Sequence, residues 1–184
     1  MITLKSDFYI KIYDYVFMDN HIHLVLYLQS TVLLSKFMQK VFSLLGIFIN
    51  KQLKRSGRVF GERPKTPVIE DSSYYWNTTM YISKNPIRAS ICDKPKKYKW
   101  CSFCHYAYGK KDPLVDDAPE YLGLSKSPTL RRKLYQKMAH NPIHRHGKRR
   151  PEMSSWYFIG HAEWVRAMMI ERGFIKPPKP PGVT

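Results

Sequence analysis

The residues of this chain best suited to chemistry are two histidines on either side of Ile22. Successive side chains of a strand point to opposite faces, so His21 and His23 would share one face of a strand. Two imidazoles held side by side on a rigid element form half of a site for a divalent metal. Two ordinary strand histidines are the competing interpretation, and the pair alone favours that one.

A tyrosine and an amide that could complete such a site lie about sixty residues later. Tyr81 and Asn85 are four residues apart in a helical stretch, hence on one face and one turn apart. If Asn85 joins His21 and His23 around one ion, the ligand set is neutral and the ion keeps its charge for a phosphate. Tyr81 would then attack a phosphodiester in line, which gives a phosphotyrosine and a free 3′ hydroxyl. Lys84 is the lysine nearest in sequence that could favour the ionised tyrosine.

The apolar pattern predicts the elements that would position these residues. Residues 8–18 are rich in β-branched and aromatic side chains, Asp19-Asn20 suits a two-residue turn, and apolar residues resume after it, which predicts a β-hairpin. Apolar residues at three- and four-residue spacing then predict an amphipathic helix, capped by Ser30 or Thr31 and ended by Gly57. The apolar positions expected to cover the sheet are Leu33, Leu34, Phe37, Met38, Val41, Leu45 and Phe48.

Three further helices are predicted downstream. The first begins with the acidic and hydroxyl residues 70–73 and ends near Asn85, because Pro86 restricts the residue before it. The second begins at Ser127-Pro128 and ends at Asn141-Pro142, and the third lies within residues 156–172 after a short apolar piece. The Pro-rich residues 176–184 are expected to be polyproline-like and disordered.

The chain is strongly basic, with 31 Lys and Arg against 14 Asp and Glu and a formal net charge of +17 over 184 residues. Since aromatic residues make up 14% of the sequence and apolar segments recur, disorder does not explain the charge, and a nucleic-acid partner is expected. The basic connector 54–65 and the segment 94–111, where lysines alternate with aromatic residues, would contact phosphates and stack on bases. A solvated loop and aromatic residues anchored in the core are the respective alternatives. The residues expected to bind nucleic acid are Lys54, Arg55, Arg58, Arg63, Lys65, Arg88, Lys96, Lys97 and Trp100.

Cysteine usage and hydropathy favour a soluble, cytoplasmic protein. The three cysteines are sparse and odd in number, and no stretch resembles a secretory signal or a transmembrane span. Cys101 and Cys104 have the spacing of half a zinc site, but the sequence holds no second cysteine pair. A second His-x-His pair, His144 and His146, lies in a basic segment and is expected to face phosphates rather than a metal.

Three segments, in order, resemble blocks of the single-tyrosine HUH transposases, and the branch of REP-associated tyrosine transposases most closely. They are Met18-Asp-Asn-His-Ile-His-Leu24, Tyr81-Ile-Ser-Lys-Asn-Pro-Ile-Arg-Ala89 and Pro95-Lys-Lys-Tyr-Lys-Trp-Cys-Ser102. The similarity runs from about residue 8 to about residue 108, and residues 158–164 resemble a piece near the C-terminus of that branch. By this resemblance His21 and His23 are metal ligands, Tyr81 is the nucleophile, and Asn85 completes the metal site.

The resemblance implies an α+β fold with a ferredoxin-like antiparallel sheet and helices packed on it. The sheet is expected to lack the family's first strand, because only about seven residues precede the hairpin. Residues 1–125 would form the nuclease domain, 126–175 a basic helical extension and 176–184 the tail.

The resemblance also implies an activity. The enzyme would cut and rejoin single-stranded DNA with hairpins (REP-like palindromes) through a 5′-phosphotyrosine, with Mg²⁺ or Mn²⁺. It would act as a monomer or homodimer near the nucleoid in the cytoplasm, with no membrane partner. Two alternatives stay open, namely a truncated, inactive binder of structured single-stranded nucleic acid and a metal-independent structural RNA-binding protein.

Overall fold

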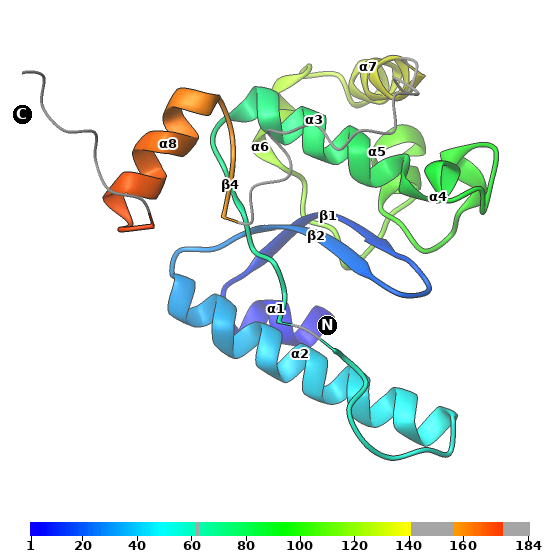
Figure 1. Cartoon of the computed structure of the whole chain (residues 1–184). Coiled ribbons are helices and arrows are strands. Elements are labelled where there is room, and N and C mark those ends of the chain that lie inside the picture. The colour runs from blue at the N-terminus through cyan, green and yellow to red at the C-terminus, as the bar shows by residue number, and fades with distance from the viewer. Residues whose placement is uncertain (62, 141–156, 175–184) are drawn as a thin grey trace, which may run out of the picture. The chain divides into compact units, whose positions relative to one another are not determined.

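Helices and short strands make up the computed structural model of this chain, which describes residues 1–61, 63–140 and 157–174 (Figure 1). The predicted α+β class is confirmed. The elements in chain order are α1 (Ile2–Asp7), β1 (Lys11–Phe17), β2 (Ile22–Tyr27), α2 (Thr31–Gln52), β3 (Val68–Ile69), α3 (Ser72–Ser83), α4 (Asn85–Arg88), the 3₁₀ helix η1 (Pro95–Lys97), α5 (Phe103–Tyr108), α6 (Pro119–Gly123), α7 (Pro128–His140), β4 (Phe158–Ile159) and α8 (Ala162–Glu171).

Two compact units share these elements. Unit 1 comprises Met1–Arg63 and Thr79–Ile143, and unit 2 comprises Pro64–Thr78 and His144–Thr184. The boundary falls within α3, so the last residues of that helix belong to unit 1 together with the hairpin. His144, His146 and the Pro-rich tail lie outside the described residues.

The predicted hairpin is confirmed as the antiparallel pair β1–β2 of unit 1. Asp19 and Asn20 form its two-residue loop, which the bond from Met18 N to His21 O closes (2.9 Å). In this register Val16 lies opposite His23, and one irregularity follows Ile12. The register therefore fixes the face on which His23 lies.

The outer edge of β1 is covered by residues 98–116 rather than by a full strand. Phe17 N donates to Trp100 O (2.9 Å) and Ser102 N donates to Tyr15 O (3.1 Å), around a single bridge from Val16. Farther along the edge, Asp116 N donates to Ile12 O (2.8 Å) and the Asp116 carboxylate accepts from Ile12 N (2.9 Å). The Tyr106 hydroxyl donates to Tyr13 O. These bonds satisfy backbone groups that an open edge would leave to solvent or to another chain. In the described part of the chain, no strand pairs with the outer edge of β2.

Helix α2 packs on the sheet side as predicted over its first half only. Ser30 caps it, since the Ser30 hydroxyl accepts from Val32 N (3.3 Å), and Phe37 and Val41 are buried. Phe48, predicted to pack, is instead 58% exposed. The helix diverges from the hairpin toward its C-terminal end (Figure 1), so its last turns do not pack on the sheet.

The predicted end of α2 is wrong. The helix stops at Gln52, five residues before Gly57, and Lys54 already takes a left-handed backbone with φ 48°. Asn50 explains the early stop, because its amide Nδ2 donates to Gly57 O (2.8 Å) and its Oδ1 accepts from Arg55 (3.2 Å). The Asn50 side chain thus holds the basic loop against the end of the helix.

By length and composition, α2 is also the one helix in the described residues that could cross a membrane. Core helices of soluble proteins meet the same criterion, and Phe37, Met38 and Val41 of α2 are buried. The predicted cytoplasmic location and the absence of a membrane partner therefore stay predictions.

An aromatic cluster fills the rest of the unit 1 core. Tyr106 of α5 packs edge-on against Tyr121 of α6 (ring centroids 4.7 Å apart) and at a tilt against Tyr135 of α7 (5.4 Å). Phe103 completes the cluster at 5.8 Å from Tyr135. The predicted helix α7 is confirmed, including its cap, where Ser127 Oγ accepts from Leu130 N (3.4 Å).

Unit 2 joins two distant segments through the short parallel pair β3–β4, in which Ile69 lies opposite Ile159. Asp71 caps α3, because its Oδ1 accepts from the backbone N of Ser73 (2.8 Å) and of Tyr74 (3.1 Å). The predicted helix start at residues 70–73 and the last predicted helix, α8, are both confirmed.

Candidate functional site

The two histidines of the hairpin lie together, as their spacing predicts. The His21 and His23 rings are 4.9 Å apart between centroids and meet at 84°. Two imidazoles bound cis to one ion through nitrogens at about 2.1 Å would have ring centroids roughly 4.7 Å apart. The separation of 4.9 Å is close to this value, and it is also that of an ordinary edge-to-face ring contact.

The nitrogens of this pair suit metal binding. The Nδ1 of His21 lies 2.6 Å from Asn20 Oδ1, so a bond to Asn20 orients the ring and leaves Nε2 for a ligand. Burial, and next the neighbouring His21, lowers the pKa of His23 to about 4. His23 is therefore neutral at pH 7, which is the form that coordinates a metal.

Tyr81 lies next to this histidine pair. The ring of Tyr81 is 5.9 Å from that of His23, edge to face, although the two residues come from α3 and β2. The guanidinium carbon of Arg88 lies 4.7 Å from the centroid of the Tyr81 ring. Within the described residues, the Tyr81 hydroxyl has no hydrogen-bond partner. A half-exposed phenol beside two imidazoles and a guanidinium is a plausible nucleophile for a phosphate ester.

Asn85, the predicted third ligand, begins α4 directly after the helix that carries Tyr81. A turn at Lys84 separates the two helices, and only 8% of Asn85 is exposed. Its Nδ2 is buried without a hydrogen-bond partner in the described part of the chain. An unsatisfied buried donor is costly, and Nδ2 fits a hydrogen bond to an anionic ligand such as a phosphate oxygen, whereas Asn85 would coordinate a metal through Oδ1. No measured contact among the described residues joins Asn85 to His21 or His23.

Lys84 lies between Tyr81 and Asn85 in the sequence, and its side chain is half-buried. Burial lowers the pKa of the Lys84 ammonium, so a larger share of neutral amine is present near pH 8 than for an exposed lysine. Such an amine can take a proton from a tyrosine.

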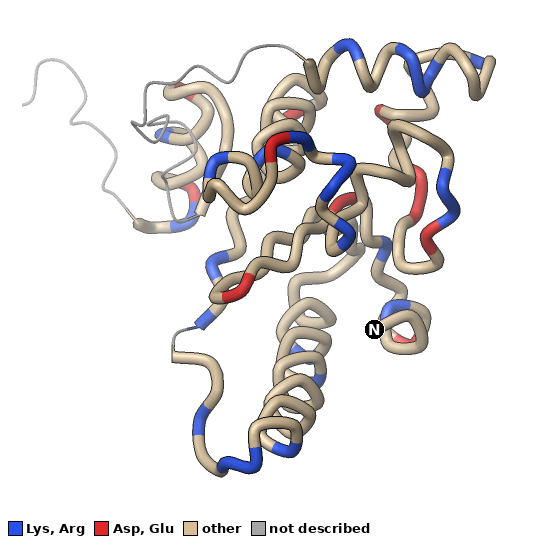
Figure 2. Tube along the Cα trace, turned by 90° about the vertical axis from the view of Figure 1, so that its right-hand side faces the viewer, with Lys and Arg blue, Asp and Glu red and all other residues tan. Residues whose placement is uncertain are grey.

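The residues predicted to bind nucleic acid form two groups, and one residue, Lys65, belongs to neither. The first group lies where α2 ends and the loop after it begins, and Figure 2 shows Lys and Arg gathered there. In that loop Arg55 donates to Arg58 O (3.0 Å) and Arg58 donates to Phe60 O (2.5 Å), so both guanidiniums also shape the loop. The members of the loop group are Lys54, Arg55, Arg58 and Arg63. Lys65 is in neither group because it belongs to unit 2.

The second group lies around η1 in unit 1. Trp100 is 54% exposed and the Lys99 ammonium lies 4.6 Å from its ring centroid, while Lys97 pairs with Asp93 (2.8 Å). Of the aromatic residues of segment 94–111, Tyr98 is buried, as expected of a core anchor, and Trp100 is exposed, as expected of a surface for base stacking. The members of the η1 group are Arg88, Lys96, Lys97 and Trp100.

A cluster in unit 2 was missed by the sequence reasoning. Ligand atoms of Glu70, Asp71 and His161 lie within 4.8 Å of one another. Glu70 Oε2 accepts from His161 N (2.6 Å) and also lies 3.0 Å from His161 Nδ1, while Asp71 caps α3. These bonds give the cluster a structural role in holding β4 to the start of α3. Only the β3–β4 pairing brings residues 70 and 161 together, and no spacing in the sequence signals it.

Comparisons with known proteins add no relative. No family model, no curated protein and no solved structure matches this chain.

Proposed function

We propose that this chain is a metal-dependent endonuclease and strand transferase that acts on hairpin-bearing single-stranded DNA, with a ferredoxin-like fold as in the single-tyrosine HUH transposases. The observation that carries the proposal is the contact of Tyr81, from α3, with His23 of the hairpin, which itself packs against His21. The two segments that carry these residues are about sixty residues apart in the sequence, and a nucleophile beside a pair of metal-ligand side chains is the arrangement that the proposed chemistry requires.

In the proposed reaction Tyr81 cuts one DNA strand. The Tyr81 oxygen forms a bond to phosphorus, the bond from phosphorus to O3′ breaks, and the released O3′ takes up a proton. The phenol proton passes to neutral Lys84 or to water. The reverse attack by a 3′ hydroxyl on the phosphotyrosine rejoins strands, and because the ester bond is conserved the reaction needs no nucleotide cofactor.

The residues around Tyr81 would hold the phosphate for this attack. Mg²⁺ or Mn²⁺ bound by His21 and His23, with Asn85 as the third ligand, would supply positive charge to a non-bridging phosphate oxygen. Arg88 adds a fixed cation beside the Tyr81 ring. The η1 group and the loop group would bind the backbone on either side, with Trp100 as a surface for base stacking.

An inactive binder of structured single-stranded nucleic acid is the second candidate function. The sheet of unit 1 favours it, because in the described residues that sheet contains only β1 and β2, fewer strands than a ferredoxin-like sheet. The charge of +17 would support binding in either case.

A covalent-adduct assay separates the two functions. The full chain is incubated with labelled hairpin-bearing single-stranded DNA and Mg²⁺ or Mn²⁺, and the products are run on a denaturing gel. The proposal expects a protein-linked product that chelator and Tyr81→Phe abolish and that Tyr9→Phe, at a 77% exposed tyrosine, leaves intact. Metal-independent binding without any covalent product would instead identify an inactive binder.

A further inference from the structure

A cavity in unit 1, built from other elements than the hairpin site, also has the composition of a ligand site. Its volume is about 460 Å³, and α5, α6, α7 and the loop 109–117 line it. This volume lies within the usual range of small-ligand pockets, roughly 300–1,000 Å³, and far exceeds what a single phosphate ion fills.

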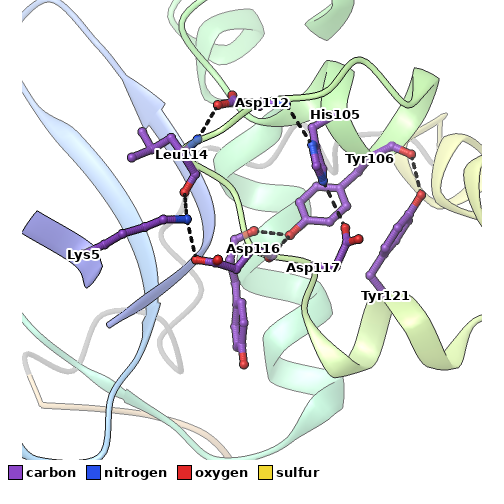
Figure 3. Close-up of polar contacts among 9 residues, drawn as sticks. Lys5, His105, Tyr106, Asp112, Leu114, Asp116, Asp117 and Tyr121 are labelled. Carbon is purple, nitrogen blue, oxygen red and sulfur yellow. Dashed lines mark hydrogen bonds and ion pairs between the residues drawn. The ribbon is translucent and has the colours of Figure 1, made fainter. Parts of the chain in front are cut away.

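The negative charges of the cavity are already engaged. Asp112 Oδ2 accepts from the Tyr15 hydroxyl (2.7 Å) and Asp112 Oδ1 accepts from Leu114 N (2.9 Å). Asp117 lies 3.0 Å from His105 Nε2, and His105 Nδ1 accepts from Asp112 N (3.3 Å), so His105 donates to Asp117 (Figure 3).

The positive charges of the cavity are not engaged in the same way. Lys111, Arg131 and Arg132 line it, and none of them pairs with a carboxylate among the described residues. The lining carries three cations against two carboxylates, a net charge of +1, and both carboxylates already accept hydrogen bonds, so the free donors of the cations favour an anion.

Arg131 is hydrogen-bonded in place by the protein, and Arg132 packs against the backbone of Gly109. Arg131 Nη1 donates to Ser125 O (2.8 Å), and the Arg131 guanidinium lies 5.6 Å from the Tyr121 ring centroid. Arg132 lies directly against Gly109, where a Cβ would overlap its guanidinium. Gly109 has φ +69°, so glycine serves both the backbone conformation and the close approach of Arg132. Preorganised guanidiniums lose little entropy when an anion binds.

We propose that this cavity binds the phosphate group of a nucleotide. Arg131, Arg132 and Lys111 would hold the phosphate, and Pro113 and Pro128 offer apolar walls for the sugar and base. The phosphate belongs either to a free nucleotide or to the 5′ end of a DNA strand, and both present the same dianion to the arginines. Pro128 begins α7, so the positive end of that helix dipole adds to the attraction.

The test measures binding of deoxyadenosine monophosphate to the full chain by calorimetry, with deoxyadenosine as the uncharged probe. We expect the nucleotide to bind and the nucleoside to bind at least about tenfold more weakly, because the charge-assisted bonds are lost. Arg132→Gln should weaken nucleotide binding about tenfold or more, and Lys133→Gln, the same charge change at an exposed neighbour, less than about twofold.

A pair of uncharged variants provides the second measurement. Gly109→Ala should weaken binding by displacing Arg132, whereas Gly123→Ala, where a Cβ meets nothing within 4 Å, should not. Thermal melts of both variants show whether the fold is kept. Equal binding of nucleotide and nucleoside, or full binding by Arg132→Gln, would overturn the proposal.

The source of the phosphate is resolved by a short oligonucleotide with a 5′-phosphate. Competition by this oligonucleotide supports a strand end as the ligand, and binding of the mononucleotide alone supports a free nucleotide. Tyr81→Phe should leave all of this binding unchanged, so failure of the cavity proposal and failure of the proposed endonuclease are separable.

Discussion

Replacing Asp14 with asparagine should remove a large pH dependence from the stability of this protein. Asp14 is fully buried, accepts a bond from the Ser102 hydroxyl at Oδ1 and has no partner at Oδ2 in the described part of the chain. Burial raises the pKa of Asp14 from 3.8 to about 7. At about 1.4 kcal/mol for each pH unit between these values, ionisation costs the folded state roughly 4 kcal/mol at pH 8.

The sign follows from the raised pKa. Below pH 4 the carboxyl is protonated in both states and its stabilising contribution is complete. Between pH 4 and pH 7 the unfolded chain loses its proton first, so the free energy of unfolding falls, and above pH 7 it falls no further. An asparagine has the same size and does not titrate. Relative to Asp14→Asn, the wild type should therefore be most stable at low pH and should lose about 2–3 kcal/mol of that advantage between pH 5 and pH 8.

Urea unfolding of both proteins, followed by circular dichroism at pH 5, 6, 7 and 8, measures this difference. All other titrating groups are shared, so they cancel in the comparison. Asp19→Asn, at an exposed loop position, is the control and should show no such trend. A stability difference between wild type and Asp14→Asn that stays constant from pH 5 to pH 8 would refute the reasoning.

Three further predictions concern the site and the covered edge of β1. His23→Ala should abolish metal-dependent cleavage, because it removes one of the two imidazoles of the proposed metal site; initial rates with and without Mn²⁺ test this, and cleavage by His23→Ala at the wild-type rate would contradict it. Trp100→Ala should weaken binding of hairpin DNA about tenfold, measured by fluorescence anisotropy, while Tyr9→Ala should not. Tyr106→Phe should lower the free energy of unfolding by about 1–3 kcal/mol, because the Tyr13 carbonyl loses its hydrogen-bond donor. The control Tyr108→Phe, at a 46% exposed tyrosine, should change the free energy of unfolding by less than about 0.5 kcal/mol. Equal changes in the two variants would contradict a stabilising role for the Tyr106 bond to the edge of β1.

Local chemistry made much of this fold predictable. Asp19 and Asn20 gave the turn, Ser30 and Asp71 gave the helix starts, and the two-residue period placed His21 and His23 together. Each of these features depends on residues within a few positions of one another, where backbone preference and hydrogen bonding act directly.

The features that could not be predicted depend on distant partners. The coverage of β1 by residues 98–116, the bond network that ends α2 at Gln52 and the pairing of β3 with β4 leave no periodic trace in the sequence. Phe48 shows the same limit, because helical spacing identifies an apolar face but not how far the sheet beneath it extends. The cavity of Arg131 and Arg132 likewise requires three helices that only tertiary packing brings together.

The most direct test of the proposed function is to locate the DNA on the protein. The adduct formed with hairpin-bearing single-stranded DNA and Mn²⁺ is digested with nuclease and trypsin, and the peptide of residues 66–84 is fragmented in a mass spectrometer. This peptide holds Tyr74, Tyr75 and Tyr81, so the fragment ions must assign the nucleotide to one of them. The proposed mechanism predicts a nucleotide on Tyr81 alone. A nucleotide on Tyr74 or Tyr75, or a peptide that is never modified under conditions where the DNA binds, would contradict it.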